Sequence, residues 1–247
     1  MEQYESTVTD HQTVTDADPV TAKYETSEQY MFKAMVFEEM GKLREALEVL
    51  EKKSDKIVDK VGSLEQKARL HAALAAAEGG GGAAGPDGVA AAATYRELLA
   101  RMPDNHRYHE GLQRVIGIAV GGVQPDASQL SSLKDLYAEL QKAHPRSDTC
   151  KRFPLDFLSG ADFAAAVRDF VVKPIRKGVP SLFRNLKALY ADPAKGAEMG
   201  VAFAEIEKSL ASTGKFPGAS EPEAKPDDCR VYALTLLAHH KDKIGDS

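Results

Sequence analysis

Residues 27–50 read SEQYMFKAMVFEEMGKLREALEVL, and this stretch decides the fold. Its first half carries apolar residues at steps of three and four, namely Tyr30, Ala34, Phe37 and Met40. That spacing is typical of one face of an α-helix, and Ser27 stands where an N-cap would satisfy the first amides. After Gly41 a second apolar stripe begins, and the turn between the stripes is too short for anything but antiparallel packing. The stretch therefore predicts a helical hairpin.

Six positions of this hairpin match the large, small, aromatic, glycine, small and large residues of the tetratricopeptide pattern. They are Tyr30, Ala34, Phe37, Gly41, Ala46 and Leu50. The small residues Ala34 and Ala46 would let the paired helices approach closely. Similar but divergent units follow along the chain. The pattern resembles an all-α, tetratricopeptide-like solenoid of helical hairpins, which implies a right-handed superhelix.

Changes in composition divide the chain into segments. Residues 1–25 lack any helical or strand period and are expected to be a disordered leader. The solenoid is predicted over residues 26–211, a loop rich in Pro, Gly and acidic residues over 212–228, and the start of a further repeat over 229–247. That last helix lacks a partner to cover Leu234 and Leu237. We therefore expect the chain to be a segment of a longer protein or a truncated gene model.

A glycine-rich stretch, EGGGGAAGPDG at residues 78–88, interrupts the second repeat. So many glycines are costly within a helix, and we predict a flexible surface insertion. A phosphate-binding loop is the functional alternative. No GK[ST] sequence follows and no strand precedes, which argues against that loop.

Composition excludes several classes of protein. The 247 residues contain 43% hydrophobic and 28% charged residues with a formal net charge of −5, so no general attraction to nucleic acid is expected. The N-terminus has neither the basic nor the apolar region of a signal peptide, and no run of about 18 apolar residues occurs. We expect a soluble, cytoplasmic protein.

No residue pattern points to catalysis, a cofactor or a metal. Cys150 and Cys229 lack any metal-binding spacing and are expected to be buried, reduced thiols. Four histidines on predicted helices are expected to be solvated at the surface: His106, His109, His239 and His240. Adjacent histidines point about 100° apart on a helix, so the last two cannot hold one metal together.

One basic cluster stands out in this acidic chain. It comprises Lys173, Arg176, Lys177, Arg184 and Lys187 and straddles a predicted turn. These cations are candidates for contact with an acidic partner surface or with ribosomal RNA phosphate. The alternative is that they only solvate exposed helix faces.

Several stretches are more specific than a generic repeat. They are YETSEQYMFKAMVFEEMGKLREALEVLEK (24–52), AATYRELLARMPDNHRYHEGL (92–112), RFPLDFLSGADF (152–163) and KGVPSLFRNLKALYADPAK (177–195). Together they resemble the auxiliary subunit of the NatA N-terminal acetyltransferase complex. The resemblance covers residues 24–246 and corresponds to an interior part of that longer subunit. The last two stretches weigh most, because helical packing alone does not demand PLDFLSG and KGVPSLF at this separation.

The resemblance implies a non-catalytic scaffold. The family's helical superhelix wraps an acetyltransferase catalytic subunit and places it at the ribosome, where nascent N-termini are acetylated. Acetyl-CoA and the catalytic residues belong to that partner, so no cofactor is expected on this chain. The family's inositol hexakisphosphate site lies downstream of this part, and no ligand residue is carried over. Ribosome contact is expected through the full-length protein, without direct nucleic-acid binding by this segment and without a membrane.

The runner-up interpretation is a tetratricopeptide adaptor of the co-chaperone kind. Such modules clamp a C-terminal carboxylate with Lys and Asn side chains in a concave groove. The first helix here carries Lys33, Ala34 and Glu38 without the repeated Lys/Asn arrangement that a clamp requires. The sequence therefore favours the scaffold.

Overall fold

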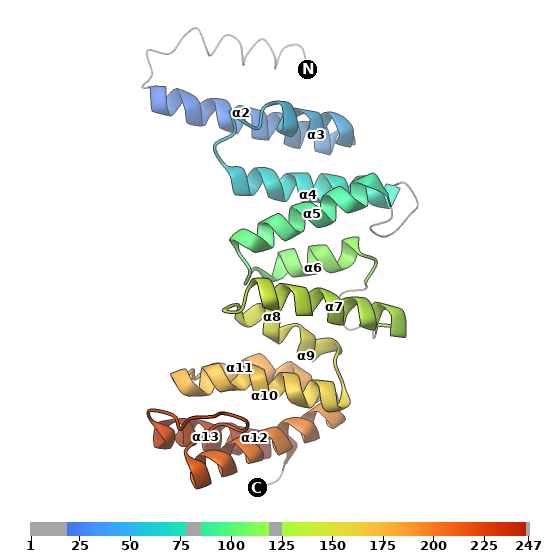
Figure 1. Cartoon of the computed structure of the whole chain (residues 1–247). Coiled ribbons are helices and arrows are strands. Elements are labelled where there is room, and N and C mark those ends of the chain that lie inside the picture. The colour runs from blue at the N-terminus through green and yellow to red at the C-terminus, as the bar shows by residue number, and fades with distance from the viewer. Residues whose placement is uncertain (1–18, 78–84, 119–124, 246–247) are drawn as a thin grey trace. The chain divides into compact units, whose positions relative to one another are not determined.

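The computed structural model describes residues 19–77, 85–118 and 125–245, which contain helices and no strand (Figure 1). The all-α fold built from helical hairpins is therefore confirmed. The helices form two compact units, Met1–Val123 and Gln124–Ser247. This division was not predicted, because the sequence indicated one solenoid over residues 26–211 with a glycine-rich insertion at 78–88.

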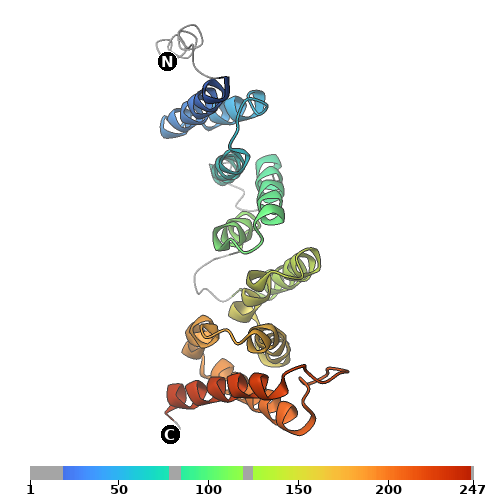
Figure 2. The same cartoon turned by 90° about the vertical axis from the view of Figure 1, so that its left-hand side faces the viewer.

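The first unit consists of helices that pack on their neighbours in sequence. They are α2 (Pro19–Glu39), α3 (Leu43–Lys52), α4 (Lys60–Ala77), α5 (Pro86–Arg101) and α6 (His106–Val115). The pairs α2–α3 and α4–α5 make the most extensive contacts, and α3 on α4 and α5 on α6 continue the series. Figure 2 shows the α2–α3 pair side by side. This serial packing is the hallmark of a helical repeat protein.

The predicted first hairpin is present with its predicted core. Ala34 and Ala46 are both fully buried at 0% exposure, so the helices meet closely at these small residues. Gly41 has a φ of 72°, and the amide of Lys42 donates to the carbonyl oxygen of Phe37 at 2.9 Å. This bond closes the end of α2 in the manner of a glycine C-cap and turns the chain into α3.

The predicted start of the first helix is wrong. α2 begins at Pro19, eight residues before Ser27, so the predicted leader is helical over its last seven residues, 19–25. Ser27 is 1% exposed within the helix, and its hydroxyl oxygen accepts a hydrogen bond from the amide of Val58 at 2.8 Å. Ser27 therefore ties α2 to the segment before α4 instead of capping a helix. The rest of the predicted leader, residues 1–18, lies outside the described residues.

The predicted insertion at 78–88 is also too long. Helix α5 begins at Pro86, a residue that favours the first turn of a helix, and Asp87 and Gly88 are buried. The three residues 86–88 are therefore part of the folded unit and not a surface loop. Residues 78–84 lie outside the described residues.

The second unit also consists of helices in series. They are α7 (Ala127–Ala143), α8 (Asp148–Arg152), α9 (Pro154–Phe157), α10 (Gly160–Lys177), α11 (Leu182–Leu186), the 3₁₀ helix η1 (Lys187–Ala191), α12 (Pro193–Thr213) and α13 (Pro226–Ile244). A capping box starts α7, where the Asp126 side chain accepts from the amide of Gln129 at 2.8 Å. Contacts of α12 with α13 and of α10 with α12 are the most extensive in this unit.

One hydrophobic core holds the second unit together from α9 to α13. Its largest fully buried side chains are Leu155, Phe163, Ile175, Leu186, Met199 and Phe203. The loop between α12 and α13 is shorter than predicted, because residues 226–228 already belong to α13. Phe216 in this loop is 3% exposed and packs on the same core, so the loop is partly folded onto the unit.

Both cysteines are buried free thiols, as predicted. Burial raises the pKa of the Cys229 thiol and so disfavours the thiolate, which is the reactive form. None of the described helices combines the length and the apolar character that a membrane span requires.

Candidate partner-binding surfaces

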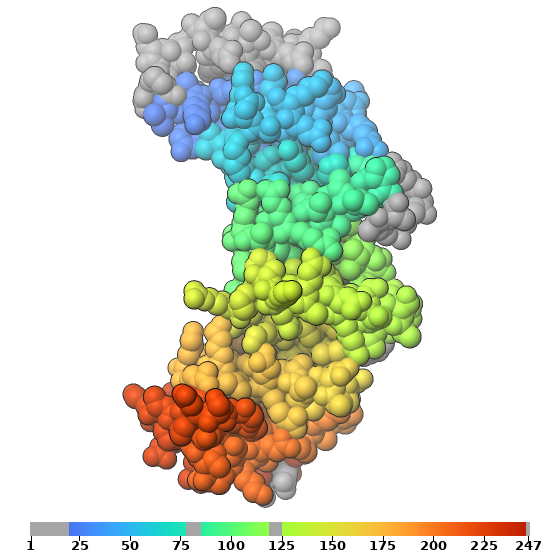
Figure 3. Space-filling model, in the orientation of Figure 1, coloured from blue at the N-terminus to red at the C-terminus, as the bar shows by residue number. Residues whose placement is uncertain are grey.

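Exposed apolar side chains concentrate on two helices, one in each unit. On α2 they are Val20, Tyr24, Phe32 and Met35, and on α13 they are Val231, Tyr232, Leu234 and Ile244. Figure 3 shows α13 at the surface of the second unit. The predicted exposure of Leu234 is confirmed at 44%, whereas Leu237 packs partly against the core. Exposed apolar side chains mark sites of protein contact where they form a continuous patch.

The predicted basic cluster splits into two groups in the structure. The first group, Lys173 and Arg176 on α10, is engaged inside the chain. Lys173 Nζ lies 2.5 Å from a carboxylate oxygen of Asp148 and donates to the carbonyl oxygen of Arg146 at 2.8 Å. Arg176 pairs with Glu223 at 2.7 and 2.5 Å. These two cations therefore fasten α8 and the α12–α13 loop to α10.

The Arg176–Glu223 pair is the stronger of these two contacts. The bidentate hydrogen bonds lower the pKa of Glu223, whose side chain is only 12% exposed, and they raise the pKa of Arg176. The guanidinium also lies 5.3 Å from the ring centroid of Phe216. Both partners of the ion pair are thus held by contacts that a solvated surface pair lacks.

The second group, Lys177, Arg184 and Lys187, is exposed. Within the described parts of the chain these three cations form no ion pair, so they remain available to an external partner. They come from the end of α10, from α11 and from the first residue of η1. Three of the five predicted candidates are thus exposed without an ion pair among the described residues, one before and two after the turn that follows α10.

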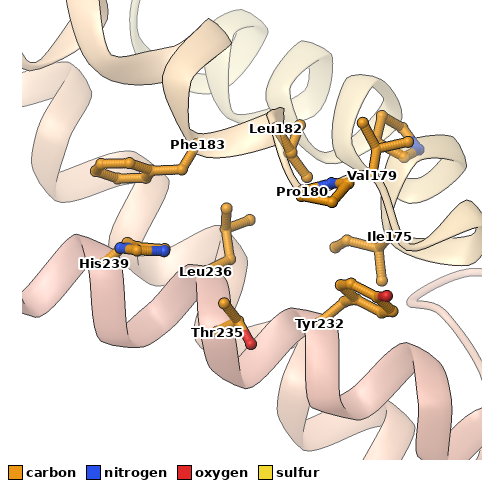
Figure 4. A pocket seen from close by; sticks show the side chains of 10 residues that line it. Ile175, Val179, Pro180, Leu182, Phe183, Tyr232, Thr235, Leu236 and His239 are labelled. Carbon is orange, nitrogen blue, oxygen red and sulfur yellow. The ribbon is translucent and has the colours of Figure 1, made fainter.

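A groove of about 190 Å³ lies beside that turn (Figure 4). Its lining comprises Pro174, Ile175, Val179, Pro180, Leu182, Phe183, Tyr232, Thr235, Leu236 and His239. Side chains from α13 face those of α10, α11 and the turn across the open space in Figure 4. The Phe183 and His239 rings stack with centroids 4.9 Å apart and close one end. Sequence patterns missed this groove, because its two walls are about 50 residues apart in the chain.

The turn that forms one wall depends on Gly178. Its φ is 64°, in the left-handed region that glycine tolerates best, and a Cβ atom there would lie 2.5 Å from the Tyr232 ring. The glycine of the KGVPSLF stretch therefore has two functions. It ends α10, and it lets Tyr232 of α13 pack against the turn.

The PLDFLSG stretch is held by a residue of the following stretch, which sequence reasoning missed. Lys195 of α12 is 6% exposed, and burial lowers the pKa of its amine. Its Nζ atom donates to the carbonyl oxygens of Leu155 and Asp156, both at 2.8 Å. These carbonyls lie in the short helix α9, which is too short to pair them within the helix. The two most specific stretches of the sequence are thus joined by hydrogen bonds in the folded chain.

Two of the four histidines predicted to be solvated are buried. His109 is 1% exposed, with Nε2 2.8 Å from the carbonyl oxygen of Pro103. His240 is 7% exposed, with Nδ1 2.9 Å from the Tyr190 hydroxyl. The prediction was wrong because each ring has a partner outside its own helix: Pro103 lies six residues before His109, and Tyr190 lies fifty residues before His240. His106 and His239 are exposed, as predicted.

A buried carboxylate joins three helices of the first unit. Asp87 of α5 is 2% exposed and accepts from Arg44 of α3 at 3.1 and 2.5 Å, while His71 Nδ1 of α4 lies 2.8 Å away. Burial alone would raise the pKa of Asp87. The hydrogen bonds from His71 and Arg44 outweigh that effect and lower the pKa. In the part of the chain that the structure describes, no group of three or more potential ligands is placed to hold a metal.

Comparison with known proteins places these features in a family. The family model "N-terminal acetyltransferase A, auxiliary subunit" matches residues 24–247. The N-terminal acetyltransferase A complex auxiliary subunit NAA15 of Arabidopsis thaliana is 36% identical over 245 residues, which are 99% of this chain and 25% of that protein. The N-alpha-acetyltransferase 16, NatA auxiliary subunit, of Mus musculus is 29% identical over 230 residues, which are 92% of this chain and 24% of that protein.

A solved structure is similar as well. A chain in the structure of Naa15/Naa10 bound to HypK-THB matches with a TM-score of 0.74 and 28% identity, covering 98% of this chain and 32% of the other. The present chain spans about a quarter of the length of the curated relatives. With its family model matched from residue 24 to residue 247, the chain belongs to the auxiliary-subunit family of N-terminal acetyltransferase A.

Proposed function

We propose that this chain is part of a non-catalytic scaffold that holds an acetyltransferase catalytic subunit for the acetylation of protein N-termini. The family match over residues 24–247 carries the proposal. The similarity to a chain of the Naa15/Naa10 structure supports it, because that structure contains two different subunits, Naa15 and Naa10. Helical repeats suit this role, since each repeat contacts mainly its neighbours and leaves a long surface free for a partner.

In this proposal the two subunits divide the chemistry. Acetyl-CoA and the reacting groups belong to the catalytic subunit, and the present chain contributes contact surface. The exposed apolar side chains on α2 and α13 are candidates for such contact. We further propose that the assembled complex acts in the cytoplasm at the ribosome, with ribosome contact made by the full-length protein.

A carboxylate-clamp adaptor is not favoured by the contacts of the first helix. Lys33 Nζ lies 5.9 Å from the ring centroid of Phe37, and Glu38 accepts hydrogen bonds from Gln66 and Arg69. These side chains serve contacts inside the first unit. A clamp needs several cationic or amide groups that converge on one open groove.

Co-expression with a NatA catalytic subunit tests the proposal. We expect this chain to co-purify with the catalytic subunit, and the complex to acetylate peptides that begin with Ser or Ala. The chain alone should give no product above the buffer control. The full-length auxiliary subunit serves as the positive control for an active catalytic subunit. If it retains the catalytic subunit and this folded chain does not, the proposed role of this segment is wrong.

A further inference from the structure

The groove between α10, α11 and α13 is large enough and apolar enough to bind one large apolar side chain. Its floor is formed by Ile175, Leu182 and Leu236, which are at most 5% exposed. Its rim includes the half-exposed rings of Phe183 and Tyr232. A cavity of about 150 Å³ is known to hold a benzene molecule, so 190 Å³ is sufficient for a Leu or Phe side chain.

The three exposed cations lie within four residues of side chains that line this groove. Lys187 begins η1, four residues after the lining residue Phe183. Lys177 lies three residues after the lining residue Pro174 on α10, so these two residues share one side of that helix. Arg184 is adjacent to Phe183 in sequence and is exposed. The α10–α11 side of the groove therefore carries three positive charges that no described carboxylate neutralises.

The opposite wall does not offset this charge. On α13, Asp228 precedes the lining residue Tyr232 by four residues and lies 3.8 Å from Lys225, so it already has a cation. Asp242 and Lys243 follow His239 by three and four residues and contribute opposite charges. The surroundings of the groove are therefore positive overall, in a chain whose formal net charge is −5.

We infer that this groove binds an acidic segment of the catalytic subunit, with one large apolar side chain seated between Phe183 and Tyr232. The inference rests on the proposed function for the identity of the partner and on charge complementarity for the chemistry of the segment. The apolar side chain supplies burial at the centre, and flanking carboxylates meet Lys177, Arg184 and Lys187. Contacts arranged in this way give an anchor with a charged rim.

Charge reversal tests the rim. We expect the triple variant K177E/R184E/K187E to raise the Kd for the catalytic subunit about tenfold or more and to weaken the salt dependence of binding. The matched control is K142E/R146E/K208E, which reverses three exposed cations of the same unit that do not line the groove. The control has the same net charge and should bind within about twofold of the unchanged chain.

Filling the groove tests the anchor. Thr235 is exposed and lines the groove, so Thr235→Trp occupies the space without disturbing the core. We expect a similar rise in Kd of about tenfold, since the apolar side chain of the partner loses its seat. Thr235→Ala keeps the groove open and should bind normally. Circular dichroism melts confirm that each variant is folded.

The outcomes separate this inference from the proposed function. If the unchanged chain binds the catalytic subunit and both groove variants bind equally well, the inference is wrong and the proposed function stands. If the unchanged chain does not bind, both fall. Light scattering measures the mass of the chain in solution and so shows whether a second copy of the chain binds in the groove. A dimer of the unchanged chain that both variants abolish, with unchanged affinity for the catalytic subunit, would also overturn the inference.

Discussion

The amine of Lys195 lies 2.8 Å from the carbonyl oxygen of Leu155, forty residues earlier in the chain. This contact fastens the short helix α9 to α12. Four residues are too few for a helix to satisfy its own final carbonyls, so α9 depends on a donor from elsewhere. One buried side chain thus adds a polar tie to the apolar packing of Leu155, which holds α9 in the core of the second unit.

Replacing Lys195 should destabilise the second unit. The Lys195→Met variant keeps the apolar stem but removes the donor from the buried carbonyl oxygen of Leu155 and the partly buried one of Asp156, which costs about 1–3 kcal/mol in the free energy of unfolding. Urea unfolding followed by circular dichroism measures this cost. The control Lys208→Met changes an exposed lysine of the same helix and should stay within about 0.5 kcal/mol. Equal stability of the two variants would contradict the capping role.

Alanine substitutions at two glycines of the second unit distinguish the cost of backbone strain from the cost of a side-chain clash. Gly178 and Gly218 have φ values of 64° and 81°, but only Gly178 has Tyr232 within 2.5 Å of an added Cβ atom. Gly218→Ala should cost about 1–2 kcal/mol from its left-handed backbone alone. Gly178→Ala should cost about 1–3 kcal/mol more, because the Tyr232 ring must move. Thermal melts compare the two, and similar losses would show that the Gly178–Tyr232 contact is unimportant.

Two further glycines on α12 should respond to alanine in opposite directions. At Gly196 an added Cβ atom meets the Tyr190 ring at 3.4 Å, an ordinary contact, so Gly196→Ala should gain about 0.5–1 kcal/mol from helix propensity. At Gly200 it would lie 2.3 Å from Nε2 of His240. Gly200→Ala should therefore displace the imidazole and lower the melting temperature. A higher melting temperature for Gly200→Ala would contradict the close approach of α12 and α13.

The Asp87 network predicts how the stability of the first unit depends on pH. The pKa of Asp87 is lowered from its ordinary value of 3.8, so its carboxylate contributes stability above that value. The contribution is lost as the pH falls through the lowered pKa. Asp87→Asn should cost about 1–3 kcal/mol above about pH 5, and the difference from the unchanged chain should shrink below pH 3.8.

Urea titrations at several pH values measure that difference. The exposed Asp55 of the same unit provides the control, and Asp55→Asn should stay within about 0.5 kcal/mol of the unchanged chain. A constant difference between Asp87→Asn and the unchanged chain down to pH 2 would contradict the ionised, hydrogen-bonded state of Asp87.

Local patterns in the sequence were sufficient to predict the repeat architecture. The burial of Ala34 and Ala46 and the turn at Gly41 follow from spacings within one hairpin, where neighbours in sequence are neighbours in space. Burial of both cysteines was predictable from the general behaviour of free thiols in helical proteins.

Polar contacts between distant residues were not predictable. Asp87 lay at the edge of a glycine-rich stretch, and its partner Arg44 is 43 residues away. Lys173 and Arg176 looked like free surface cations, yet their carboxylate partners are 25 and 47 residues distant. No periodicity reports on such pairs, so the sequence alone grouped engaged and available cations together. The structure separates the three that remain available.

Binding of the catalytic subunit to this chain tests the central claim most directly. An equimolar mixture of the two purified proteins, separated by size-exclusion chromatography with light scattering, gives the mass of whatever complex forms. We predict one peak with the mass of a one-to-one complex that contains both proteins. Two separate peaks at the masses of the individual proteins, with this chain folded by circular dichroism, would contradict the account.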